Sequence, residues 1–428
     1  MSGPEAGSRQ LSAAQLGVWY AQRLAPTSPV FNMGGYLDVR GPLDTGLLAA
    51  ATEALVAEDE TARLRFTETD GVPAQYLVPE VAYSAEVLDL SGEPDPAGAA
   101  ERFMRADMDT VADLERGPLL RHVILRLGPE RTVLFSRTHH LIRDGYSAGL
   151  LRRRVGEIYA RLAGSGDGGT PLGSFWQLLD EQERYPHSAA HGRDRAHWQT
   201  VMADAVRPPG PGAARKPAFR IARDVSHLGR ETFTRLCRFS ERAGVSWQQA
   251  VIGAAVLHRY RLTGDPDVLL SLPVTGRLSA KARRVPGMTA NVLPLRCRVD
   301  PGETCEELVS RVAAQVLRAQ WHQRYGASEL LRDIGWPADG RRQFGPVVNV
   351  LAAEEQSTFA GLPATEHLLS TGGTAEDLAV TVTRGPEEGL RVDLTIDAAY
   401  EQAAGLESQR NTFHRTVASM TQQPGTTV

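Results

Sequence analysis

The chain is poor in the features that define several other classes of protein. Its three cysteines, Cys237, Cys297 and Cys305, form neither a CxxC pair nor an even framework, so we expect a reducing compartment and no disulfide scaffold. No apolar run approaches the ~20 residues that a membrane helix needs. The N-terminus also lacks the charged and apolar regions of a signal peptide. We therefore expect a soluble, cytoplasmic protein without a membrane partner.

Lysine is nearly absent. Lys216 and Lys281 are the only two lysines, so arginine carries almost all of the positive charge. The formal net charge is -4, whereas a protein that binds nucleic acid usually has a basic patch or stripe. The arginine run at 152–154 is interpreted as the solvated face of a helix. We expect no nucleic-acid partner.

The heptapeptide HHLIRDG at residues 139–145 is the most informative stretch of the chain. The residues before it alternate with a period of two, which predicts a strand that ends at the two histidines. After it, apolar residues recur at helical spacing as far as Leu162, and Asp144 stands at the N-cap position. Successive side chains of a strand point to opposite faces, so His139 and His140 cannot both face one cleft.

Residue chemistry alone is compatible with three interpretations of this turn: a catalytic site, a structural turn and a metal site. Histidines beside an aspartate at the end of a strand are typical of a catalytic site, because rigid scaffolds often present functional residues on loops. The histidines are equally compatible with a structural role, with Asp144 as a plain N-cap. A metal site is the third reading. We expect no metal, because adjacent histidines splay apart and no cysteine or HExxH partner lies nearby.

Strands mixed with helices predict a mixed α/β (α+β) fold. A chain of 428 residues with 42% hydrophobic content can bury two linked cores. The glycine-rich segment 164–169 formally matches GxGxxG, but it follows a helix instead of a strand, so it is interpreted as a linker. This gives an N-terminal lobe of residues 1–170 and a C-terminal lobe of residues 171–428. Periodicity predicts further strands at 119–127, 267–274, 377–383 and 390–396 and helices at 246–262, 304–320 and 403–420.

Other motifs place the heptapeptide in a family context. The segments LSAAQLGVWY at 11–20, ETARLRF at 60–66 and GMTANVLPLR at 287–296 resemble the first, second and fifth motifs of the condensation domains of nonribosomal peptide synthetases. HHLIRDG matches the HHxxxDG signature of the same family, which belongs to the chloramphenicol acetyltransferase-like superfamily. The motifs occur in the expected order across nearly the whole chain. Asp59 stands where the second motif usually has a histidine.

The resemblance implies a fold and a reaction. The fold would be two chloramphenicol acetyltransferase-like lobes in a V, each a mixed sheet with flanking helices. The reaction would be amide bond formation between a carrier-bound acyl or aminoacyl thioester and an aminoacyl acceptor, as in antibiotic biosynthesis and other secondary metabolism. The expected partners are donor and acceptor carrier proteins or adjacent synthetase domains. These would supply the phosphopantetheine arm, so we expect a monomer that binds no cofactor directly.

The stretches at 31–36 and 286–288 most resemble starter or stand-alone actinobacterial members of the family, whose donor is often an acyl group other than a peptide. The sixth motif is reduced to His322 and Glu329. The region of the sixth motif and the approach to the late strand at residues 340–343 are expected to help form the second lobe and the acceptor side.

The resemblance also assigns roles to residues. His140 is expected to act as the base or to position the amine, and the Gly145 N–H at a helix start is suited to stabilise an oxyanion. The residues expected to support the site are His139, Asp144 and Arg296. Among these, Asp144 and Arg296 are expected to form an ion pair across the lobes.

Asn349 is expected to orient the acceptor, with a plain polar position in a sheet as the alternative reading. Two other functions also stay open. One is a superfamily acyltransferase that uses coenzyme A or forms an ester, and the other is a noncatalytic platform that recruits proteins. The intact His140, Asp144 and Gly145 favour catalysis, because a recruiter does not need them.

Overall fold

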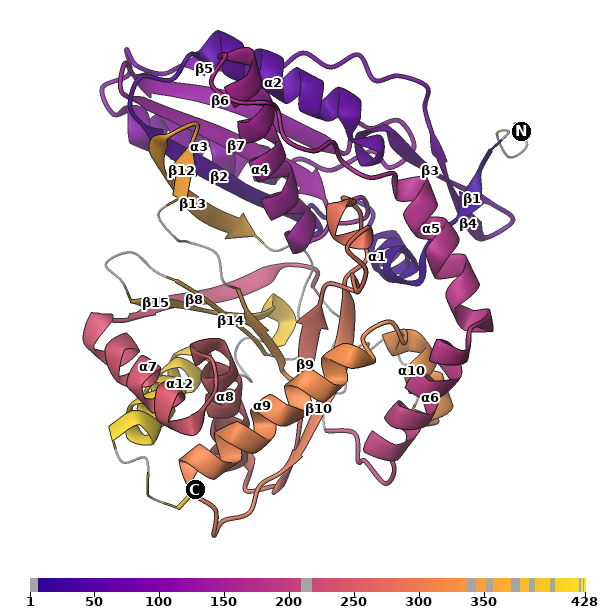
Figure 1. Cartoon of the computed structure of the whole chain (residues 1–428), viewed down its shortest axis with the longest axis vertical. Coiled ribbons are helices and arrows are strands. Elements are labelled where there is room, and N and C mark those ends of the chain that lie inside the picture. The colour runs from indigo at the N-terminus through magenta and orange to yellow at the C-terminus, as the bar shows by residue number, and fades with distance from the viewer. Residues whose placement is uncertain are drawn as a thin grey trace. The chain divides into compact units, whose positions relative to one another are not determined.

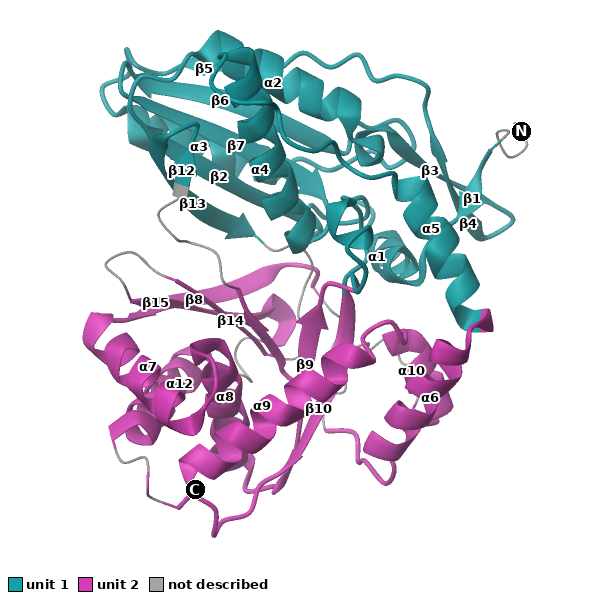
Figure 2. Ribbon diagram, viewed as in Figure 1, with its two compact units in different colours: residues 1–186, 277–290, 355–373 teal, residues 187–276, 291–354, 374–428 magenta. Residues whose placement is uncertain are grey.

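The chain forms two compact units, each composed of three separate segments of the sequence (Figure 2). The computed structural model describes residues 7–208, 218–336, 344–351, 357–370, 378–384, 389–400 and 405–422, together with residues 425, 427 and 428. Unit 1 comprises residues 1–186, 277–290 and 355–373, and unit 2 comprises residues 187–276, 291–354 and 374–428.

This division differs from the single cut after residue 170 that the glycine-rich segment predicted. The segment 171–186 packs with unit 1, because the carboxylate of Glu60 accepts hydrogen bonds from the Ser174 hydroxyl (2.9 Å) and the Trp176 N–H (3.3 Å). Composition marks a flexible stretch but carries no information about which unit the residues after it contact. The return of two later segments to unit 1 has no local signal in the sequence.

Unit 1 is built on a six-stranded mixed sheet (Figure 1). Its order is β12 (Ser357–Phe359), β13 (Leu362–Ser370), β2 (Asn32–Arg40), β7 (Arg131–His139), β6 (Leu120–Gly128) and β5 (Glu86–Asp89). All neighbours are antiparallel except β5 and β6. In Figure 1 the late, orange β13 lies beside the early, indigo β2. A small antiparallel sheet consists of β1 (Arg9–Gln10), β4 (Val72–Leu77) and β3 (Leu64–Thr69).

Helices cover both faces of the large sheet in unit 1. The alternation along β7 assigns the faces, since Leu134 packs with one group of helices and Phe135 with another. The Leu134 face carries α2 (Thr45–Glu58) and α4 (Gly145–Leu162), and the Phe135 face carries α3 (Pro96–Met108). The remaining helices of unit 1 are α1 (Ala13–Leu24), α5 (Phe175–Arg184) and the short 3-10 helices η1 (Glu60–Arg63), η2 (Tyr185–His187, at the unit boundary) and η3 (Ala282–Arg284).

Unit 2 has its own six-stranded mixed sheet. Its order is β10 (Asn291–Arg298), β9 (Asp267–Val274), β11 (Val347–Val350), β14 (Ala379–Arg384), β15 (Leu390–Asp397) and β8 (Ile221–Leu228), with β9, β11 and β14 parallel. One face packs against α7 (Arg230–Ala243), α8 (Trp247–Thr263), α9 (Cys305–Trp321) and α12 (Leu406–Gln422). The other meets α6 (Ala189–Val201) and α10 (Ala327–Asp333), and η5 (Ala398–Tyr400) follows β15.

The predicted mixed fold class is confirmed, and the predicted strands and helices are present, although residue 377 of one strand and residues 403 and 404 of one helix lie outside the described residues. The predicted helix after the heptapeptide is α4, which ends at Leu162, and the predicted strand 267–274 has the bounds of β9. Ser246 caps α8 in a capping box with Gln249, as its sequence position suggests. The two late strands pair as β14 and β15, although the turn residues 385–388 between them lie outside the described residues. None of the described helices has both the length and the apolar character needed to span a bilayer.

Candidate active site

The heptapeptide forms the connection from β7 to α4 within unit 1. The N–H groups of His139 and His140 donate to the carbonyls of Leu119 and Phe31, each at 2.8 Å, so regular pairing continues to the second histidine. The chain then turns, and α4 begins at Gly145. The predicted strand, turn and helix are therefore confirmed, and the turn is anchored at its start by backbone hydrogen bonds.

His139 is a buried, neutral imidazole. Its Nδ1 accepts a hydrogen bond from the Leu141 N–H (3.2 Å), so the proton lies on Nε2, which donates to the Gln22 Oε1 (3.0 Å). The orientation of the Gln22 amide is fixed because its Nε2 donates to two backbone carbonyls. Burial, together with the neighbouring His140, lowers the pKa of His139 to about 3. Both of its ring nitrogens are used inside the protein.

His140 is half-buried, and its ring has one nitrogen engaged. Its Nδ1 lies 3.0 Å from the carbonyl oxygen of Arg143. A carbonyl oxygen only accepts hydrogen bonds, so Nδ1 must carry the proton. In the neutral ring the lone pair then lies on Nε2, which is the nitrogen able to accept a proton from another molecule.

Asp144 is buried at the centre of a polar network. Its Oδ1 accepts hydrogen bonds from the N–H (2.9 Å) and the hydroxyl (2.8 Å) of Ser147, which makes it the N-cap of α4. Its Oδ2 accepts from Arg277 Nη1 (2.7 Å) and from the Thr289 N–H (3.2 Å). Burial by itself raises the pKa of Asp144, but the charge and hydrogen bonds of Arg277 and the bonds from Ser147 outweigh it. The pKa therefore lies below its ordinary value.

The expected ion pair between Asp144 and Arg296 is wrong. Arg296, on β10 of unit 2, binds Asp267 on the neighbouring strand with two guanidinium nitrogens (2.9 and 2.6 Å), and its Nη1 reaches Asp204 (3.0 Å). Its guanidinium is thus committed to two carboxylates within its own unit. The partner of Asp144 is Arg277, at the start of the segment 277–290 that packs with unit 1.

The segment 277–290 is the part of the site that sequence reasoning missed. Besides Arg277, it supplies the Gly287 N–H, which donates to the Ser147 hydroxyl (3.0 Å), and the Thr289 groups that bind Asp144. The segment lacks the periodic apolar pattern of a helix or strand, so its contacts could not be read from the sequence. Only its resemblance to the fifth family motif pointed to it.

The other two predicted site residues occupy different settings. Gly145 is exposed at the first position of α4, and a Cβ built there would meet no atom within 4 Å. The packing of the described residues thus does not require glycine at this position. Asn349 lies half-buried on β11 of unit 2, opposite Thr381 on β14. The structure therefore groups His139, His140, Asp144 and Gly145 in one turn of unit 1 and assigns Arg296 and Asn349 to unit 2.

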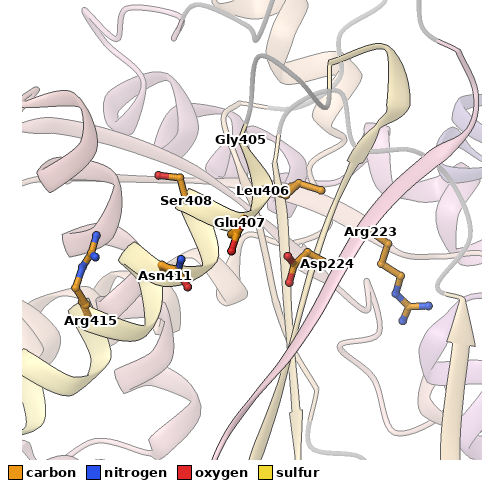
Figure 3. A pocket seen from close by; sticks show the side chains of 8 residues that line it. All are labelled: Arg223, Asp224, Gly405, Leu406, Glu407, Ser408, Asn411 and Arg415. Atoms are coloured by element: carbon orange, nitrogen blue, oxygen red, sulfur yellow. The ribbon is translucent and has the colours of Figure 1, made fainter.

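The structure also contains a cavity lined by polar residues, and this cavity is separate from the turn at residues 139–145. The cavity, of about 630 Å³, lies in unit 2 between β8 and the start of α12 (Figure 3). Its wall includes Asp224, which is ion-paired to Arg410 (2.9 Å). Within the described part of the chain, no group of three or more histidine, cysteine or carboxylate side chains is arranged to hold a metal. The turn at residues 139–145 is therefore the candidate active site.

Loss of the Asp144 carboxylate should destabilise unit 1. The variant Asp144→Ala leaves the buried guanidinium of Arg277 without its counter-charge, which typically costs ~3–5 kcal/mol. Urea unfolding of wild type and variant measures this difference in the free energy of unfolding. The double variant Asp144→Ala/Arg277→Met should recover much of the loss. Equal losses in the single and double variants would contradict the importance of the pair.

Acidification provides a second measurement of the same pair. Because the folded-state pKa of Asp144 is lowered, its stabilisation is fully present above the unfolded pKa and is lost as pH falls through the folded one. Wild type should therefore lose stability in acid more steeply than Asp144→Asn, whose side chain does not titrate. Parallel curves for the two proteins would rule out this contribution.

Comparison with known proteins gives the turn a context. The condensation domain family model matches residues 5–428. An isonitrile lipopeptide synthase of Streptomyces coeruleorubidus is 35% identical over 390 residues, which cover 90% of this chain and 26% of the synthase. Enterobactin synthase component F of Escherichia coli (strain K12) is 31% identical over 369 residues, which cover 85% of this chain and 28% of that protein. The chain thus spans about a quarter of the length of these curated relatives.

Solved structures agree with the sequence comparison. A variant of the starter condensation domain of rhizomide synthetase in complex with C8-CoA matches with a TM-score of 0.87 and 31% identity, covering 98% of this chain and 96% of that one. The first condensation domain of the calcium-dependent antibiotic synthetase in complex with a substrate analogue matches with a TM-score of 0.86 and 31% identity, covering 99% and 98%. With the family model, the fold and the HHxxxDG turn in agreement over nearly its whole length, this chain belongs to the condensation domain family of nonribosomal peptide synthetases.

Proposed function

We propose that this chain transfers an acyl group from a carrier-bound thioester to the amine of a carrier-bound aminoacyl acceptor. Condensation domains catalyse amide bond formation, which is an acyltransferase reaction. The observation that carries the proposal for this chain is the state of the His140 ring. Its Nδ1 is bonded to the Arg143 carbonyl, which leaves Nε2 with a lone pair for the amine.

The reaction needs a neutral amine, a route for its proton and stabilisation of the charge that develops on the carbonyl oxygen. The amine nitrogen forms a bond to the thioester carbon, and the bond from this carbon to sulfur breaks. His140 Nε2 accepts or orients the amine proton, and the departing thiolate of the donor arm takes up a proton to become a thiol. Positioned proton transfer of this kind typically contributes ~10²–10⁴ in rate.

Gly145 is proposed to contribute its N–H to the developing oxyanion. At the first position of a helix, this N–H has no helical carbonyl to bind, and the helix end favours negative charge. The open space beside its Cα suits an approaching substrate. His139 and Asp144 are proposed to hold the turn through their buried hydrogen bonds. Asn349 is proposed to orient the acceptor.

The donor is proposed to be an acyl group other than a peptide. The resemblance of residues 31–36 and 286–288 to starter members supports this, as does the likeness to the rhizomide synthetase starter domain in complex with C8-CoA. Coenzyme A thioesters and hydroxyl acceptors define the alternative activity, an ester-forming or coenzyme A-dependent transferase. A noncatalytic recruitment platform is the third possibility for the same fold.

The proposed partners are carrier proteins or carrier domains, since condensation domains bind no cofactor and the phosphopantetheine arm belongs to the carriers. Two exposed apolar pairs support carrier docking. In unit 1, Tyr20 and Leu24 lie four residues apart on α1, and in unit 2, Leu317 and Trp321 lie four residues apart on α9. Trp321 is 75% exposed, which is unusual for so large an apolar side chain. The proposal includes a monomeric state and a cytoplasmic location. The three free cysteines support a reducing compartment.

Replacement of His140 tests the catalytic proposal. A carrier loaded with an acyl donor is mixed with a second carrier loaded with an amino acid, and mass spectrometry follows the products. We expect His140→Ala to lower the rate of amide formation by ~10²–10⁴, because the amine loses its proton acceptor. Parallel reactions with coenzyme A thioesters and with alcohols test the alternative transferase. Amide formation that is unchanged in His140→Ala would remove the catalytic role, and carrier binding without any product would favour the platform.

The role of Gly145 has a matched control on the same helix. Gly145→Ala should fold normally, because the added Cβ meets no protein atom, yet it should slow transfer by narrowing the approach to the N–H. Gly149→Ala adds the same methyl one turn later, at an ordinary 3.7 Å from Arg152, and should leave transfer unchanged. Both variants are compared by thermal unfolding and by kcat. Equal activities for the two would contradict a role for Gly145.

Removal of the exposed tryptophan tests docking. Trp321→Ala should raise the KM for a carrier-bound substrate roughly tenfold, as expected for the loss of an aromatic interface anchor. The KM for a small soluble thioester should stay the same, because it needs no docking surface. Leu262→Ala removes another exposed apolar side chain, on α8, as the control. If the KM for the carrier-bound substrate is the same in wild type and in Trp321→Ala, the result would argue against a carrier at this face.

A further inference from the structure

The carbonyl that binds His140 belongs to a residue whose own side chain is buried. Arg143 is 3% exposed, and its guanidinium pairs with the carboxylate of Asp59, which is fully buried. This ion pair joins the turn to the end of α2, because Asp59 directly follows that helix. A buried arginine one residue before the N-cap of α4 is not explained by the reaction itself.

The pair is completed by a threonine hydroxyl. Arg143 Nε donates to the Thr61 Oγ1 (3.2 Å), and this hydroxyl donates to the Asp59 Oδ1 (2.7 Å). The same Oδ1 accepts from the Thr61 N–H (2.9 Å), so Asp59 also caps η1. The Nε and Nη2 groups of Arg143 and both donors of Thr61 thus have acceptors inside the protein. We call Asp59, Thr61 and Arg143 the turn clamp.

The peptide between residues 143 and 144 is fixed from both sides. On one side the turn clamp holds the Arg143 side chain, and on the other Asp144 is bound by Arg277 and Ser147. The carbonyl of this peptide is the acceptor for His140 Nδ1. Its position therefore decides which ring nitrogen carries the proton, because a neutral imidazole takes the tautomer that its fixed partner selects.

We propose that Asp59, Thr61 and Arg143 are positioning residues that hold His140 in the tautomer with an unprotonated Nε2. A buried ion pair by itself contributes little net stability, because the cost of desolvating both charges offsets their attraction. Its effect here is to set the geometry of the turn. Asp59 stands where the second family motif usually has a histidine. The inference rests on the proposed function of His140.

The tautomer can be observed directly in the full-length protein. Histidine labelled with ¹⁵N gives separate NMR signals for protonated and unprotonated ring nitrogens, and comparison with His140→Ala assigns those of His140. In wild type we expect a protonated Nδ1 and an unprotonated Nε2. In Asp59→Asn and in Arg143→Met we expect the two signals to move toward each other, as both tautomers become populated.

Kinetics give the second measurement. The two variants should lower kcat by ~10-fold or more, within the range of general base catalysis, while the KM for donor and acceptor changes by less than about twofold. A purely structural role would reduce the amount of folded protein but would not move kcat per folded molecule. Where a single variant does not fold, the double variant Asp59→Asn/Arg143→Met removes both charges and is measured in its place.

A second buried arginine in unit 1 provides the matched control. Arg154 on α4 is buried, so the solvated face expected for residues 152–154 is wrong for this residue. It binds Glu58, the residue before Asp59. Glu58→Gln weakens an ion pair of the same type and should leave both the His140 signals and kcat unchanged.

The outcomes separate the clamp from the proposed function. Folded Asp59→Asn and Arg143→Met proteins with wild-type His140 signals and wild-type kcat would overturn the clamp, and so would an equal loss in Glu58→Gln. A wild-type protein that forms no amide, but whose variants still shift the His140 signals, would support the clamp and contradict the proposed function.

Discussion

The buried ion pair between Asp144 and Arg277 is the constraint on which the candidate site depends. Both side chains are almost entirely excluded from solvent, so each charge needs the other. The pair joins the start of α4 to a segment more than a hundred residues later in the chain. Because Asp144 is also the N-cap of α4, one carboxylate fixes both the helix start and the loop that packs on it. The two neighbouring histidines differ in their hydrogen bonds. Both ring nitrogens of His139 are bonded inside the protein, whereas the described residues bond only Nδ1 of His140.

Much of the fold could be predicted because it follows local rules. The alternation before His139, the N-cap at Asp144 and the helical spacing to Leu162 gave a strand, a turn and a helix, and the structure has them at those residues. The mixture of strands and helices predicted the fold class, and the family motifs added the family and its reaction. The pairing of charges could not be predicted, because it depends on which segments meet in space. Arg296 ends the segment that resembles the fifth motif and Arg277 lies ten residues before that segment, and only the fold shows that Arg296 is bound by Asp267 on the adjacent strand. Asp59 differs from the histidine that is usual in the second motif, but the sequence does not indicate its partner. This partner, Arg143, occupies one of the variable positions of the HHxxxDG signature.

The exchange of segments between the units limits how this protein can be divided. A fragment of residues 1–186 would carry the whole heptapeptide, yet it would lack Arg277 and the strand β13. Asp144 would then be buried without its cation, and the edge of β2 would be open to pairing with other chains, a common route to aggregation. Recombination of related synthetases at the glycine-rich stretch 164–169 would likewise separate residues 171–186 from the rest of unit 1, with which they pack. Crossover points for chimeric enzymes should therefore not fall between the segments of unit 1. The turn at residues 139–145 is then inherited together with the loop 277–290 that holds it.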